Sequence, residues 1–160
     1  MLIVAEPLRA EAFAPFGDVL EAPPELGRRS FFGDGLANQR AGAAPSLAVA
    51  HVPALTALPL VATRMERHQF SSQSFLPLDV ARWLVIVAPK AAAGGPDGAR
   101  ARAFLAGPGQ GVTYHADTWH HPLTVLDRPA RFAVFIWLEN SKTDEEFVTL
   151  EAPFTVTIPA

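Results

Sequence analysis

The chain has 160 residues, 49% of them hydrophobic and 18% charged, so it is long enough for one domain with a substantial core. A formal net charge of −3 with scattered Lys and Arg argues against nucleic-acid binding, and the absence of cysteine excludes disulfides, thiolate nucleophiles and Cys-based zinc sites. The longest apolar stretch, residues 83–88, is too short to cross a bilayer, and the acidic start around Glu6 is unlike a signal peptide, so we expect a cytoplasmic protein without membrane contact.

The pattern along the chain predicts mostly strands. A short helix is expected first, over residues 9–16, and residues 22–45, rich in Pro, Gly, Arg and Ala, are expected to form an ordered arm or loop over the remaining fold. Strands are expected at residues 46–52, 60–68, 73–78, 82–88, 101–106, 111–115, 121–126, 131–139 and 154–158. A second short helix is expected around residues 144–147. Turn sequences such as Gly107-Pro108-Gly109 separate the strands, and this spacing predicts an all-β sandwich or barrel in one domain over residues 1–160.

The first of two polar runs within these strands spans Glu66 to Gln73. Glu66 and His68 are two residues apart, so on a strand both side chains point to one face. Gln73 begins the next expected strand, after a short Ser-Ser turn. The run therefore predicts one wall of a pocket.

The second run spans Tyr114 to His120, about fifty residues later. Asp117 stands where a turn is needed, and Asp is among the few non-glycine residues that tolerate positive φ. Tyr114 and His115 precede this turn, and His120 enters the next strand. Trp119 and His120 are neighbours, so on a regular strand they point to opposite faces and only one of them can face the pocket.

Several fragments, in this order and spacing, resemble one enzyme family. They are Pro7-Leu8, Glu11 to Glu21, Glu66-Arg67-His68, Gln73 to Pro77, Ala103-Phe104, Gln110 to Tyr114 and Trp119 to Leu123. The chain resembles the ureidoglycolate lyases over residues 5–136. The two polar runs are also similar to the two cupin motifs, except that Glu66 replaces a His and Gln73 replaces the Glu.

This resemblance implies an all-β cupin-type barrel, a jelly-roll-like double-stranded barrel with a short N-terminal helix, usually as a homodimer. It implies a carbon–nitrogen lyase that splits ureidoglycolate into glyoxylate and urea in allantoin breakdown. Ureidoglycolate is a hemiaminal, so its cleavage needs a base for the carbinol hydroxyl and an acid for the departing urea nitrogen. Histidine can serve as either near neutral pH.

We therefore expect His68 and His120 to be the proton-transfer or metal-binding pair, with Glu66 as an orienting carboxylate, a base or a ligand. The expected substrate-binding residues are Gln73, Trp119, Tyr114, His115 and Arg40. For a substrate carboxylate, the candidate cations are Arg40, Arg64, Arg67 and Arg131, because a planar guanidinium suits it best. Strand parity places Arg67 on the face opposite Glu66.

A divalent metal, zinc, nickel, manganese or iron, could be held by Glu66, His68, Gln73 and His120, although activity without a metal stays open. Two positions depart from the family pattern: Val52 where an Arg is common and Trp137 where an Asp is common. These departures keep two alternatives open. One is a different metal-dependent cupin enzyme acting on a small hydroxy or keto acid, and the other is a barrel that binds a small acid without turning it over.

Overall fold

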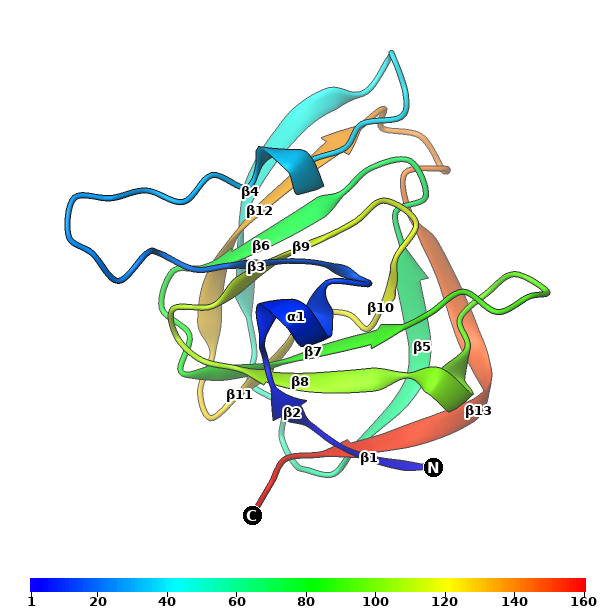
Figure 1. Cartoon of the computed structure of the whole chain (residues 1–160). Helices are drawn as coiled ribbons and strands as arrows, with labels where there is room; N and C mark the ends of the chain where they lie inside the picture. Colours follow the sequence, from blue (N-terminus) through cyan, green and yellow to red (C-terminus); the bar gives the residue numbers. More distant parts are fainter.

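The computed structural model describes residues 1–160 and consists mainly of strands (Figure 1). The strands are β1 (Leu2–Val4), β2 (Glu6–Pro7), β3 (Gly17–Leu20), β4 (Ala44–Val52), β5 (Leu60–Arg67), β6 (Gln73–Pro77), β7 (Arg82–Ala88), β8 (Arg102–Ala106), β9 (Gly111–Tyr114), β10 (Trp119–His120), β11 (Thr124–Leu126), β12 (Ala130–Leu138) and β13 (Glu146–Thr157). The helical elements are α1 (Ala10–Phe13) and two 3-10 turns, η1 (Gly33–Gly35) and η2 (Gly98–Arg100). No helix has the length and apolar character needed to span a membrane.

Two sheets face each other and form the barrel. The larger sheet has eight strands in the order β1-β13-β5-β10-β7-β8-β2, with β11 pairing on β7. The smaller sheet has five strands in the order β3-β9-β6-β12-β4. Figure 1 shows the smaller sheet lying across the strands of the larger one, with α1 beside the gap between them. This arrangement confirms the predicted all-β cupin-type barrel with a short N-terminal helix.

The hydrophobic core has two parts, which share strand β7. One cluster joins the two sheets and includes Phe13, Phe104 and Phe132. The other lies within the rolled larger sheet and includes Met65 and Phe154. Successive side chains on a strand point to opposite faces, so the odd positions of β7 enter the first cluster and the even positions enter the second. Burial on both faces explains why β7 is one continuous apolar run.

The nine expected strands are present, with shifted ends. The segment expected at residues 121–126 is divided, because Pro122, which lacks a backbone N–H, lies in the gap between β10 and β11. The expected helix at residues 9–16 is shorter, Ala10–Phe13. The helix expected at residues 144–147 is wrong: β13 begins at Glu146, which pairs with Arg67 of β5. Strands β1, β2 and β3 are additional.

The segment at residues 22–36, which we call the arm, loops out from the barrel before the chain returns to it (Figure 1). The return is anchored by backbone hydrogen bonds. Gln39 N–H donates to the carbonyl of Phe70 at 2.8 Å, and Ser72 N–H donates to that of Ala37 at 2.9 Å. The chain after the arm is therefore fixed against the turn that follows His68.

Candidate active site

Strand register brings the two polar runs together. Glu66 of β5 lies directly opposite His120 of β10. Gln73 of β6 lies opposite Tyr114 of β9 in the other sheet. The backbone carbonyl of His68 accepts a hydrogen bond from the N–H of Asp117 at 2.9 Å, and Asp117 has a φ of +68°. The site therefore forms where the two sheets meet, and the Asp117 turn positions His120 in it.

His120 is enclosed by hydrogen-bond acceptors. Its side chain is 2% exposed. Its Nδ1 lies 3.0 Å from the carbonyl of Thr118, and its Nε2 lies 3.2 Å from Oε1 of Glu66 and 3.1 Å from Oε1 of Gln73. A ring nitrogen must carry a proton to donate to such oxygens. Both ring nitrogens of His120 therefore face oxygen acceptors.

His68 has the complementary arrangement. Its Nδ1 donates to the backbone carbonyl of Asp144 at 2.8 Å, which leaves the lone pair on Nε2 when the ring is neutral. Nε2 is buried and has no hydrogen-bond partner. Burial, followed by the nearby charge of His120, lowers the pKa of His68 below its ordinary value. His68 is therefore neutral near pH 7 and presents a free lone pair beside His120, with 5.8 Å between the ring centres.

Glu66 supplies a buried negative charge. Burial alone would raise its pKa, but the hydrogen bond with His120 and the neighbouring positive charge outweigh burial and lower it. The carboxylate form is therefore retained beside the His120 ring.

Tyr114 lies beneath this pair. Its ring stacks on that of His120, with 4.1 Å between centroids and 12° between planes, and it also packs against Phe13 and Phe75. Burial and then the charge of Glu66 raise the pKa of Tyr114, so its hydroxyl stays protonated. Tyr114 thus fixes the plane of the His120 ring.

The same three side chains have the donor set of a metal site. Ligand atoms of Glu66, His68 and His120 all lie within 4.8 Å of one another. Each histidine directs Nδ1 at a backbone carbonyl and Nε2 toward the other residues, the orientation that accompanies metal-binding histidines. Two imidazoles and one carboxylate match three-ligand catalytic zinc sites. The residues present therefore fit a divalent metal.

Three expected site residues are not brought into this cluster. Trp119 points to the opposite face of β10, into the second core cluster, with the guanidinium of Arg67 4.5 Å from its ring centre. His115 is exposed in the turn after β9. Arg40 forms an ion pair with Asp144, with Nη2 2.6 Å from Oδ1. Strand parity explains Trp119, because its neighbour His120 occupies the inner face.

Two acidic residues that sequence reasoning did not select lie beside the site. Asp144 accepts the hydrogen bond of His68 through its backbone carbonyl. Burial and the charge of Glu66 raise the pKa of the neighbouring Glu145, so Glu145 lies within electrostatic reach of the cluster. Both belong to the loop between β12 and β13, where the sequence predicted a helix. A backbone acceptor carries no sequence signal, so no pattern could have identified Asp144.

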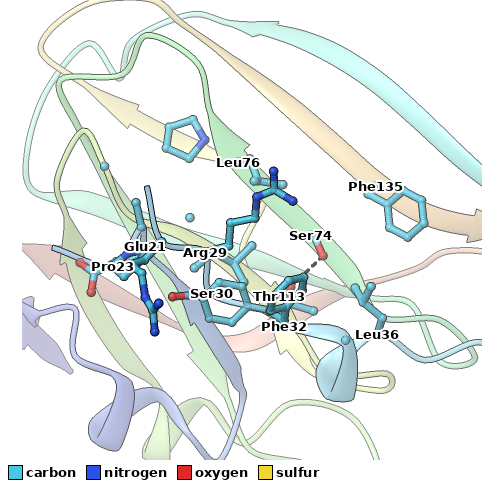
Figure 2. Close-up of a pocket in the computed structure, with 18 of the residues that line it drawn as sticks. Glu21, Pro23, Arg29, Ser30, Phe32, Leu36, Ser74, Leu76, Thr113 and Phe135 are labelled. Carbon is cyan, nitrogen blue, oxygen red and sulfur yellow. Dashed lines mark hydrogen bonds between the residues drawn. The ribbon is translucent and has the colours of Figure 1, made fainter. Parts of the chain in front are cut away.

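The largest cavity lies elsewhere, on the outer face of the smaller sheet. It has a volume of about 900 Å³ and is bounded by the arm and by β6, β9 and β12. Figure 2 shows Arg29, Ser30 and Phe32 of the arm facing Leu76 and Phe135 of the sheet. A hydrogen bond of 2.8 Å between Ser74 and Thr113 forms part of its floor (Figure 2). Residues on this face of β6 alternate with Gln73, so the cavity is separate from the Glu66, His68 and His120 cluster.

Comparison with known proteins identifies the family of this chain. The family model described as ureidoglycolate lyase matches residues 1–157. This chain belongs to the ureidoglycolate lyase family. Proteins named ureidoglycolate lyase include one from Chelativorans sp. (strain BNC1), 37% identical over 98% of this chain and 97% of its own length. Another, from Brucella melitensis biotype 2, is 40% identical over 82% of this chain and 80% of its own length. A third, from Rhodobacter capsulatus, is 41% identical over 82% of this chain and 84% of its own length.

A solved structure shares the fold of this ureidoglycolate lyase family member at low sequence similarity. The dTDP sugar isomerase of Desulfovibrio desulfuricans G20 superposes with a TM-score of 0.50 and 15% identity, covering 86% of this chain and 84% of that one. At this identity the likeness concerns the fold alone. The comparisons confirm the family expected from the sequence.

Proposed function

We propose that this protein cleaves ureidoglycolate into glyoxylate and urea. The observation that carries the proposal is the pairing, within one buried cluster, of His68, whose Nε2 has no hydrogen-bond partner, with His120, whose Nε2 faces the oxygens of Glu66 and Gln73. A proton acceptor beside a proton donor is the arrangement that combined acid and base catalysis requires. Membership of the ureidoglycolate lyase family supports the choice of substrate.

In the proposed reaction, Nε2 of His68 removes the proton from the carbinol hydroxyl. The oxygen forms the carbonyl of glyoxylate, the carbon–nitrogen bond breaks, and its electron pair passes to the urea nitrogen. Nε2–H of His120 donates the proton that this nitrogen needs, and Glu66 stabilises the imidazolium before transfer. Proton, electron pair and leaving group are thereby all accounted for, and the products are glyoxylate and urea.

Substrate binding is proposed to involve Gln73, Tyr114 and a guanidinium. Arg40 pairs with Asp144, whereas Arg64 forms no ion pair with an acidic side chain and lies two residues from Glu66 on the same strand. The guanidinium of Arg64 lies 5.5 Å from the ring centre of Phe147, the residue opposite Glu66 on β13. Of the candidate cations, we therefore favour Arg64 as the partner of the substrate carboxylate.

Trp119 and His115 are the weaker members of the predicted substrate-binding set. Trp119 packs in the second core cluster, and His115 is exposed at the turn.

A divalent metal is an alternative form of the proposal, because a bound ion would occupy the same Nε2 atoms that otherwise accept and donate the protons. Glu66, His68 and His120 would hold it, with the Gln73 amide as a weak fourth ligand. When bound, such an ion supplies a Lewis acid that favours loss of the hydroxyl proton and stabilises negative charge on oxygen. The Nδ1–H bonds of the two histidines to backbone carbonyls would orient them as ligands.

We also propose that the chain acts as a single domain, in the cytoplasm and as a homodimer. Support for the dimer comes from the outer face of the smaller sheet, where Leu47 and Val49 of the edge strand β4 are 74% and 66% exposed. Phe31 of the arm, 86% exposed, borders the cavity on the same face. An exposed apolar edge strand invites pairing with another chain, and a second copy would cover it symmetrically.

The decisive experiment follows the release of glyoxylate and urea from racemic ureidoglycolate, with the spontaneous rate subtracted. The purified protein is tested as isolated, after metal analysis, and after addition of each of the four candidate metals. Release of both products in equal amounts supports the lyase. His51→Ala, at an exposed histidine of β4, is the matched control and should retain full activity. Absence of acceleration under every metal condition would contradict the proposal.

A further inference from the structure

The loop from Glu139 to Glu145 is organised around one buried carboxylate. Oδ1 of Asp144 accepts from the backbone N–H of Glu139 at 3.0 Å, and Oδ2 accepts from that of Ser141 at 3.0 Å. Oδ1 also lies 2.6 Å from Nη2 of Arg40. These contacts to both carboxylate oxygens hold the loop in one conformation.

Arg40 joins this loop to two other segments of the chain. Its side chain is only 11% exposed, and Nη1 lies 3.4 Å from Glu139 and 3.5 Å from Oγ1 of Thr143. Its guanidinium also lies 5.4 Å from the ring centre of Phe70, within the turn after His68. Gln39, its neighbour, donates a backbone hydrogen bond to the carbonyl of Phe70. One side chain thus connects the segment after the arm, the turn after β5 and the loop before β13.

The same loop determines the orientation of His68. The backbone carbonyl that accepts the Nδ1–H of His68 belongs to Asp144 itself, at 2.8 Å. This hydrogen bond selects one of the two neutral tautomers and directs Nε2 into the cluster with Glu66 and His120. Displacement of the Asp144 backbone would remove the only acceptor that His68 Nδ1 has.

We infer that Arg40 and Asp144 are positioning residues that fix the tautomer and ring orientation of His68. Arg40 acts on the site through Asp144, and its role is distinct from binding the substrate carboxylate, because its Nη atoms already contact Asp144, Glu139 and Thr143. A buried ion pair is often no more stable than apolar residues of the same shape, so its retention fits a role in specifying a conformation. The expected loss of turnover rests on the proposed lyase function, whereas the expected change in the His68 tautomer does not depend on it.

The test uses Arg40→Gln and Asp144→Asn, which remove the charge from one side of the pair. Arg82→Gln is the matched control, because Arg82 forms an exposed two-pronged pair with Asp127 at 2.8 and 2.7 Å. Long-range proton–nitrogen NMR spectra of protein labelled at histidine nitrogens report the tautomer. The His68 signals are assigned by their loss in His68→Gln.

We expect wild type and Arg82→Gln to show His68 as a single Nδ1–H tautomer, and both site variants to show a mixture of tautomers. We also expect kcat to fall about 10- to 100-fold with little change in KM, the loss typical of residues that orient a metal-binding histidine. Arg40→Lys, which keeps a cation, should show smaller changes of the same kind. Thermal unfolding checks that each variant is folded.

An unchanged His68 spectrum in folded Arg40→Gln and Asp144→Asn would overturn the inference. So would a rise of KM alone in Arg40→Gln, which would instead make Arg40 a substrate ligand. Should the wild type not cleave ureidoglycolate, the proposed function fails, and the His68 spectra still decide the positioning role.

Discussion

Glu66 and His120 are cross-strand partners on β5 and β10, with 3.2 Å between carboxylate and imidazole. They are 54 positions apart in sequence (120 − 66), and the antiparallel register alone makes them neighbours. Removing one member of a buried charged pair leaves the other uncompensated. The pair therefore contributes both to catalysis and to stability of the fold. Substitutions must be chosen so that an effect on catalysis can be distinguished from an effect on folding.

Replacement of either histidine by glutamine should abolish most turnover. Glutamine keeps a polar side chain of similar length but cannot exchange a proton near neutral pH. We expect His68→Gln and His120→Gln each to lower kcat by roughly 10²- to 10⁴-fold, the usual contribution of a general acid or base. Steady-state kinetics give the measurement, and circular dichroism confirms folding. A folded variant with more than half of the wild-type kcat would remove that residue from the reaction.

The pH dependence should reflect the lowered pKa of His68. The base must be neutral, so activity should persist as pH falls through 6.5, the ordinary histidine value, and be lost only below it. Profiles of kcat/KM between pH 4.5 and 9 measure the acidic limb. A midpoint above 6.5 would show that the group controlling the limb is a different one.

The same shift affects folding stability. Because the pKa of His68 is lower in the folded protein, the unfolded chain binds more protons between the folded value and 6.5. The contribution of His68 to stability is then complete above 6.5 and is lost as pH falls toward the folded value. Urea unfolding across this window should show a steeper loss of stability for wild type than for His68→Gln.

Metal binding should depend on all three members of the cluster. If the cluster is a metal site, Co²⁺ used as a spectroscopic probe should bind wild type, and Glu66→Gln, His68→Gln and His120→Gln should each bind it at least about tenfold more weakly. The matched control, His51→Ala, should bind Co²⁺ like wild type. Equal binding by wild type and all three variants would exclude a metal at this cluster.

Arg64 should affect substrate affinity more than the chemical step. Hydrogen bonds to a charged group contribute about 1.5–3 kcal/mol, so Arg64→Gln should raise KM for ureidoglycolate roughly 10- to 100-fold with kcat nearly unchanged. Arg131→Gln is the control, because Arg131 pairs with Asp79 on the surface, at 2.7 Å. A KM for Arg64→Gln within twofold of wild type would assign the carboxylate to another partner.

A charge on the outer face of β4 should prevent dimerisation. Light scattering of Leu47→Glu should give a mass near 17.2 kDa, the mass of one chain, where wild type gives twice that value. Val61→Glu, at an exposed position of β5, is the matched control and should leave the dimer intact. A monomeric wild type would contradict the dimer itself, and a dimeric Leu47→Glu would move the interface elsewhere.

Much of the fold was predictable because local patterns are strong where strands are long and buried. The Val, Ile and Phe content of β12 and the apolar run of β7 predicted both strands almost to their ends. Strands β1 and β2 were not predictable, since they have three and two residues and exist only through parallel pairing with β13 and β8. No local sequence reports such long-range pairing.

The cluster of Glu66, His68 and His120 was predictable where its arrangement depends only on side chains and strand parity. Strand parity correctly anticipated that Glu66 and His68 share a face, and that Trp119 and His120 do not. The link from Arg40 to His68 could not be read, because it passes through the backbone carbonyl of Asp144. From the sequence alone, an Arg that pairs with a loop carboxylate cannot be distinguished from an Arg that binds a substrate carboxylate.

Strand β10 has only two residues, and each faces a different part of the molecule: His120 the site and Trp119 the second core cluster. Evolutionary pressure on the two neighbours should therefore differ. Position 120 should vary only when the chemistry changes, whereas position 119 should vary together with Arg67, which lies over its ring, and with Met65 of the same core cluster. In an alignment of the family, a change of activity and a change of packing would then be separable within a single dipeptide.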